Sequence, residues 1–144
     1  MDTEKQVLHL LGTEKLCFLA TSHQDRPHVS LMTFTYLAQE DLIILSSRSD
    51  TTKVKNIKKN ADVAILLYNL GNDSKMSVSC TLLGTATLLS PDKDRYYREI
   101  HYKSHPNMGT FIQGDNIAIL AVKIKEASLS DIEDKVQTWS ANGH

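Results

Sequence analysis

Short apolar runs separated by turn-forming residues recur along the whole chain. Such runs, rich in β-branched and aromatic residues, are typical of strands in a packed sheet. Six strands are predicted in this way, over residues 16–21, 28–37, 42–47, 62–69, 76–89 and 116–125. From Ser128 onward the pattern fits either a last strand or a short tail helix. Gly84 interrupts the fifth strand, which predicts a bulge or a close backbone approach at that point.

Three segments have helical spacing instead, namely residues 3–11, 51–60 and 91–103. In the second of them Val54, Ile57 and Ala61 recur on one side and define its buried face. One helix after three consecutive strands does not suit a doubly wound parallel sheet. The pattern favours a mainly β fold, a closed or nearly closed antiparallel barrel of six to seven strands with peripheral helices, because closure hides the edge strands.

The 144 residues predict a single domain covering 1–144. The formal net charge of −1 argues against a general nucleic-acid binder, so any positive patch must be local. The chain has no signal-like start and no apolar run approaching the ~18–20 residues that span a bilayer, so we expect a cytoplasmic protein without membrane contact. Cys17 and Cys80 lie in apolar runs and are predicted to be buried thiols.

Residues 46–60, SSRSDTTKVKNIKKN, combine hydroxyls and lysines directly after the third predicted strand. At 100° per residue, Lys55 and Lys59 point away from the buried face into solvent, and Lys58 flanks that face near the end of the helix. Lys53 instead falls in the first turn. Only this lysine is therefore placed beside the helix N-terminus.

A helix N-terminus offers unpaired N–H groups and the positive end of the helix dipole. Asp50, Thr51 or Thr52 fits the N-cap position. A phosphate there would accept hydrogen bonds from N–H groups, from threonine hydroxyls and from Lys53, with Arg48 close enough in sequence to help. The alternative is an ordinary solvated helix start, but Lys53 then lies against the local dipole without an anion.

The run from residue 19 to 67, which contains LATSHQDRPHVS and ends in VAILL, resembles the core of the pyridoxamine 5'-phosphate oxidase-like family of flavin-binding split barrels. The later HYKSHPNMGTFIQGDNIAILAVKI is similar to the family's HP-containing segment and closing strand. The resemblance covers about 19–125. It implies a homodimeric split β-barrel of the FMN-binding type, with FMN at the dimer interface.

The resemblance also implies which residues hold the cofactor. The strand along the flavin would contribute Ser30, Leu31, Met32 and Thr33; the strand end near the ring and ribityl chain would contribute Ser46 and Ser47; the helix start at the phosphate would contribute Thr51, Thr52 and Lys53. Family members often carry an arginine where this chain has Thr52, and Arg48 is a candidate substitute.

Departures from the authentic oxidase change the expected activity. That enzyme has an arginine and a lysine where this chain has Ser30 and Thr35, and it ends in an arginine–histidine motif that the tail TWSANGH lacks. We therefore expect a flavin-dependent reductase or oxidase of an unknown small-molecule substrate rather than a vitamin B6 oxidase, with FMN supplying the redox chemistry. No residue stands out as a catalytic acid or base. The alternatives are a non-catalytic flavin or haem carrier or sensor, and a deazaflavin-dependent reductase.

His101 and His105 are four residues apart and form a candidate metal pair. Pro106 follows and the sequence shows no third ligand, so no metal site is predicted. If the protein bound haem, the same two residues and His144 would be the histidines to consider as iron ligands. Trp139 fits either stacking near a flavin of the partner subunit or covering a hydrophobic edge.

Overall fold

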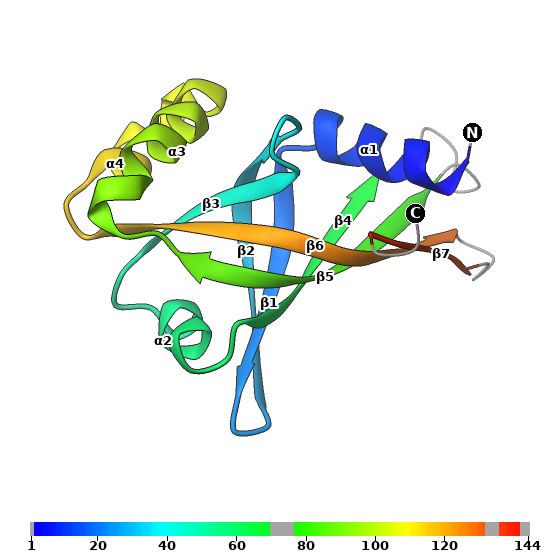
Figure 1. The fold of residues 1–144 in the computed structure, drawn as a ribbon, viewed down its shortest axis with the longest axis horizontal. Coiled ribbons are helices and arrows are strands. Elements are labelled where there is room, and N and C mark those ends of the chain that lie inside the picture. The colour runs from blue at the N-terminus through cyan, green and yellow to red at the C-terminus, as the bar shows by residue number, and fades with distance from the viewer. Residues whose placement is uncertain (1, 70–76, 132–135, 142–144) are drawn as a thin grey trace.

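The structure is a computed structural model that describes residues 2–69, 77–131 and 136–141. Its elements are α1 (Thr3–Thr13), β1 (Leu16–His23), β2 (Arg26–Leu37), β3 (Leu42–Arg48), α2 (Thr52–Lys59), β4 (Asp62–Asn69), β5 (Val78–Leu88), α3 (Pro91–Ser104), the short 3-10 helix η2 (Pro106–Met108), α4 (Gly109–Gln113), β6 (Ile117–Asp131) and β7 (Val136–Ser140). Figure 1 shows α3 and α4 together on one side of β6, and α2 on the other side near the protruding β1–β2 hairpin.

The strands form one antiparallel sheet in the order β3-β2-β1-β4-β5-β6-β7. The sheet closes on itself because β3 also pairs with β6, from Leu42 opposite Lys123 to Arg48 opposite Ile117. The second half of β6 then pairs with β7. The predicted antiparallel barrel of six to seven strands is confirmed, and so is the meander of its first three strands.

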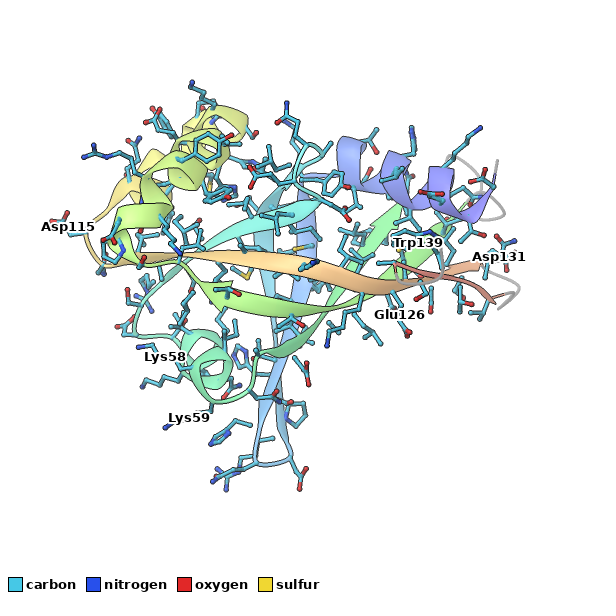
Figure 2. The ribbon with its side chains drawn as sticks, viewed as in Figure 1. Lys58, Lys59, Asp115, Glu126, Asp131 and Trp139 are labelled. Carbon is cyan, nitrogen blue, oxygen red and sulfur yellow. The ribbon has the colours of Figure 1, made fainter. Side chains whose placement is uncertain are left out.

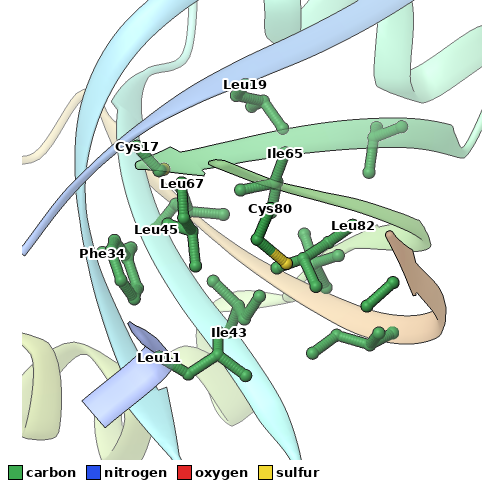
Figure 3. Packing of buried hydrophobic residues seen from close by; sticks show 14 of the residues in the cluster. Leu11, Cys17, Leu19, Phe34, Ile43, Leu45, Ile65, Leu67, Cys80 and Leu82 are labelled. Atoms are coloured by element: carbon green, nitrogen blue, oxygen red, sulfur yellow. The ribbon is translucent and has the colours of Figure 1, made fainter. Parts of the chain in front are cut away.

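The barrel interior is filled by aliphatic side chains and one phenyl group (Figure 3). Phe34, Leu45 and Ile65 are among the largest fully buried side chains. Strand alternation explains this, because every second residue of β4 and β5 faces inward. Cys17 and Cys80 are also buried, as predicted, and burial raises the pKa of each thiol to about 12.

The first hairpin is tighter than the sequence indicated. β1 continues to His23 and β2 begins at Arg26, so only Gln24 and Asp25 form the turn. Both have positive φ, 52° and 61°, as a two-residue hairpin turn requires. Pro27 lies inside β2, one residue before the predicted start of this strand. It fits there because β3 pairs only with residues 34–37 and leaves the other edge of β2 open.

Gly84 marks the bulge that its position in the sequence predicted. The β5–β6 register shifts between Leu83 and Gly84. A Cβ at Gly84 would lie 2.5 Å from the carbonyl oxygen of Lys123, so no larger residue fits without moving the backbone.

The C-terminal third differs most from the expected elements. β6 runs on to Asp131 instead of ending at residue 125, and β7 shows that the tail is a strand rather than a helix. η2 and α4 were not predicted. The expected turn at 71–73, the start of the expected strand at 76 and His144 lie outside the described residues. In the described part of the chain, no helix has the length and apolar character needed to cross a membrane.

Candidate functional site

A cavity of about 330 Å³ opens where β2, β3, the start of α2 and the η2–α4 segment meet. Its volume falls in the range of small-molecule sites. Its lining consists of Leu31, Met32, Thr33, Ser46, Ser47, Arg48, Thr51, Lys53, Met108 and Phe111. The lining therefore draws on four separate parts of the chain.

The cavity brings together seven of the nine residues that the sequence singled out for a cofactor: Leu31, Met32, Thr33, Ser46, Ser47, Thr51 and Lys53. Arg48, the candidate substitute for an arginine at Thr52, also lines it. Ser30 and Thr52 do not. Thr52 is exposed, and the Ser30 hydroxyl is buried without a hydrogen-bond partner among the described residues.

The turn from β3 into α2 is held by short-range hydrogen bonds. The Thr51 hydroxyl donates to the Arg48 carbonyl at 3.0 Å, and the Ser47 and Thr51 hydroxyls lie 3.0 Å apart. Ser49 is fixed to the start of β6 because its N–H and hydroxyl both donate to the Asn116 carbonyl. These bonds hold the α2 N-terminus at the mouth of the barrel.

The α2 N-terminus is electrostatically positive. Thr51 is its N-cap residue, but its side chain makes no cap hydrogen bond, and the first turn carries no acidic residue. Lys53 is half-buried, and burial, followed by repulsion from Arg48, lowers the pKa of its ammonium. Arg48 also forms an exposed salt bridge with Asp50, 3.6 Å long, which adds little stability because solvent screens it.

Packing and side-chain amides fix the rest of α2. Val54 and Ile57 are buried as predicted, at 1% and 5% exposure. The Asn56 amide donates to the Thr21 hydroxyl at 3.0 Å, and the Asn60 amide reaches the Ser22 carbonyl at 3.2 Å.

The remaining lysines of α2 lie away from the cavity. Lys55, Lys58 and Lys59 are exposed, which confirms the prediction of a solvated face. Figure 2 shows Lys58 and Lys59 extending from α2 away from the barrel.

Met108 and Phe111 complete the cavity from the side of α3 and α4, and the sequence did not single them out. Ile112, next to Phe111, is fully buried and anchors α4. Met108, Phe111 and Ile112 recur at i, i+3 and i+4. That spacing covers a single helical turn, which is too short to predict a helix from the sequence.

Two histidines, His101 in α3 and His105 directly after it, tie the helix to β2. Nδ1 of His101 lies 2.8 Å from the Thr35 hydroxyl, and Nε2 of His105 lies 2.7 Å from the Phe34 carbonyl. Their rings meet edge to face, 4.9 Å between centroids. Neither residue lines the cavity, and the described residues contain no group of three or more His, Cys, Asp or Glu suited to a metal.

Arg98 fixes α3 to α4 and to the start of β6. It forms a salt bridge with Asp94 at 2.8 Å and donates to the carbonyls of Ile112 and Ile117. Both charged side chains are largely buried, at 19% and 15% exposure. The segment that carries Met108 and Phe111 is therefore held at both of its ends, by His105 and by Arg98.

The site thus has two chemically different sides. On one side, N–H groups, hydroxyls and two cations are arranged for an anion. On the other side, a thioether and a phenyl group offer an apolar surface. The lining contains no histidine or carboxylate within the described residues, and so offers no conventional acid–base residue.

A sequence comparison shows the family of the chain. A family model described as pyridoxamine 5'-phosphate oxidase matches residues 3–130. The chain belongs to this family. A pyridoxamine 5'-phosphate oxidase homologue of Schizosaccharomyces pombe is 30% identical, over 96% of this chain and 90% of the relative.

Solved structures share the split-barrel fold of the pyridoxamine 5'-phosphate oxidase family at low sequence identity. A haem-binding protein from Mycobacterium smegmatis superposes with a TM-score of 0.78 at 15% identity, covering 92% of this chain and 55% of that one. An FAD-binding protein from Mesorhizobium loti superposes with a TM-score of 0.77 at 13% identity, covering 89% of this chain and 92% of that one. At these identities the similarity is one of fold.

Proposed function

We propose that this protein is an FMN-dependent oxidoreductase that acts on a small molecule. The observation that carries the proposal is the positively charged N-terminus of α2. There Lys53 and Arg48 line the same cavity as the first N–H groups of the helix. A phosphate bound there would relieve the repulsion between the two cations and would accept hydrogen bonds from the helix N-terminus.

The donor set suits a single phosphate. One lysine, one arginine and the N–H groups of the first turn lie at the helix start, while the other α2 lysines are exposed outside the cavity lining. A deazaflavin with a long anionic tail would call for a wider basic groove. The FAD-binding description of the Mesorhizobium loti neighbour is consistent with a flavin nucleotide on this fold.

When bound, FMN would supply the electron transfer, and the chain would supply position and electrostatics. Lys53 and Arg48 would hold the phosphate, and Ser46 and Ser47 would lie along the ribityl chain and ring. The backbone from Leu31 to Thr33 would line the ring. Thr35, where the authentic oxidase carries a lysine, bonds His101 instead, so vitamin B6 oxidation is not the proposed activity.

We also propose that two copies associate through the outer face of β2, β1, β4 and β5. Val29 and Leu31 lie on this face, with 64% and 59% of their surface exposed to solvent. Phe18 lies opposite both Leu31 and Leu66 in the strand register, so the apolar surface continues from strand to strand. A second copy would cover this surface and the open side of the cavity together. The cytoplasmic location stays a prediction.

The haem alternative has less support from the site. His101 and His105 are both hydrogen-bonded to β2 and lie outside the cavity lining. Their distance from the anion-binding helix start separates them from the cavity in which a cofactor is proposed.

The test is FMN binding to the purified chain, followed by fluorescence quenching and the visible spectrum. We expect one FMN per chain, a mass of two chains by light scattering, and binding weakened at least about tenfold by Lys53→Ala, because a charge-assisted contact is lost. Lys55→Ala is the matched control and should leave the affinity unchanged. Reduction of the bound flavin by NADPH with repeated turnover would separate an enzyme from a carrier. A wild-type chain that takes up no FMN would overturn the proposal.

A further inference from the structure

Phe111 is an exposed phenyl group on a firmly held helix. Its side chain is 59% exposed, while its neighbour Ile112 is fully buried. The carbonyl of Ile112 accepts a hydrogen bond from Arg98, which also fixes the start of β6. The exposure of Phe111 therefore comes from a fixed backbone that directs the ring to the cavity.

The other end of the same segment is fixed to the cavity strand. Nε2 of His105 lies 2.7 Å from the Phe34 carbonyl, directly after the cavity residues 31–33 of β2. The Met108 N–H donates to the His105 carbonyl at 3.0 Å, so the position of His105 sets that of Met108. His105 is accordingly a positioning residue for the wall formed by Met108 and Phe111.

The chemistry of this wall is apolar and polarizable. Phe111, Met108 and Leu31 contribute a phenyl ring, a thioether and an isobutyl group to the lining. The only charged side chains in the described lining are Arg48 and Lys53, which belong to the α2 side. Flat rings stack well on phenyl groups, and thioethers make favourable contacts with ring edges. A carboxylate or phosphate at the wall would lose its water without gaining a partner.

We propose that Phe111, with Met108 beside it, is the surface on which the substrate binds, and that the substrate is a flat, uncharged, conjugated ring compound of the naphthoquinone kind. The inference rests on the proposed FMN site, because it places this ligand between the wall and the flavin ring that residues 31–33 would line. Phe111 is then the residue that sets specificity for a flat ring, and Lys53 the residue that sets affinity for the cofactor.

The test is calorimetric titration of the FMN-loaded protein with menadione, and with 1,4-naphthoquinone-2-sulfonate as a charged ring of similar shape. We expect menadione to bind more tightly than the sulfonate. Phe111→Ala should weaken menadione binding about tenfold, while Phe111→Tyr should retain it within about twofold, because stacking needs only the ring. Tyr96→Ala removes another exposed aromatic residue, 56% exposed and outside the cavity lining, and should change nothing.

Three results would overturn the inference while leaving the FMN proposal standing: normal FMN uptake without menadione binding, equal menadione binding by wild type and Phe111→Ala, or tighter binding of the sulfonate. Loss of the two-chain mass in Phe111→Ala would also overturn it, since the phenyl ring would then belong to a subunit contact. A wild-type chain that binds no FMN fails at the earlier step and removes the basis of both proposals.

Discussion

The two sides of the cavity are held in place in different ways. At the α2 start, most side-chain bonds join neighbours in the sequence, since Ser47, Arg48 and Thr51 bond one another within four residues. The one distant bond of this turn runs from Ser49 to the Asn116 carbonyl, 67 residues away. The α4 side depends on distant partners: His105 reaches the Phe34 carbonyl from 71 residues away, and Arg98 reaches the Ile112 carbonyl from 14. The polar side therefore combines a locally bonded turn with one anchor on β6, whereas the apolar wall is held at both of its ends by bonds to distant parts of the chain.

The contrast predicts that the distant contacts carry more of the stability. Arg98→Ala should lower the free energy of unfolding by roughly 3–5 kcal/mol, because it leaves Asp94 as an uncompensated, largely buried carboxylate and two carbonyls without their donor. Urea unfolding measures this change. Arg95→Ala, on an exposed position of the same helix, is the control. A loss below about 1 kcal/mol for Arg98→Ala would contradict the assignment of α3 as the anchor of the wall.

A second, somewhat smaller effect concerns pH. Burial, and then the neighbouring His105, lowers the pKa of His101 to about 4. The unfolded chain binds this proton near pH 6.5, so the stability that neutral His101 provides is fully present above pH 6.5 and is lost as the pH falls towards 4. The free energy of unfolding should therefore drop by about 3 kcal/mol over this range from His101 alone.

His101→Asn isolates this contribution, since the amide keeps a polar group within reach of the Thr35 hydroxyl but does not titrate. Unfolding by urea at several pH values should give a flatter pH dependence for this variant than for wild type. His9→Asn changes an exposed histidine of α1 and should keep the wild-type slope. Parallel curves for wild type and His101→Asn would show that His101 is not held neutral by the fold.

The smallest effect is expected on the α2 side. Thr51→Ala removes the hydroxyl that bonds the Arg48 carbonyl and contacts Ser47, and should cost about 1 kcal/mol of unfolding free energy. Thr52→Ala, exposed and one residue later, should cost only a few tenths. If Thr51→Ala lowered the free energy of unfolding as much as Arg98→Ala, the proposed difference between the α2 side and the α4 side of the cavity would be wrong.

The same distinction explains what the sequence made predictable in the fold. Strands and the larger helices follow from apolar periodicity. The bulge was predictable from Gly84, because only a residue without a Cβ fits against Lys123. α4 was missed because it has five residues and a single buried side chain, too short for a periodic signal. Pro27 was left out of the predicted strand because proline fits a strand only where its edge is unpaired. Only the order of strands in the sheet shows that β2 has such an edge at Pro27.

For the site, residue patterns alone predicted Lys53, from helical spacing, and Thr51, as a candidate N-cap. Ser46, Ser47 and residues 31–33 were expected only because the chain resembles the family. Met108 and Phe111 reach the cavity only through the folded path from α3, so no local pattern connected them with β2.

The closing pair of the barrel, β3 with β6, also bears on how the chain folds. Its partners, from Leu42 with Lys123 to Arg48 with Ile117, are far apart in the sequence, and such non-local pairings form slowly because a long loop must close before any contact is gained. Ser46, Ser47 and Arg48 lie on this pair, whereas the β1–β2–β3 meander can form from neighbouring segments. We expect the binding cavity to be among the last parts of the molecule to take shape, so that a newly made chain gains its ligand site only once β6 has been added and the barrel has closed.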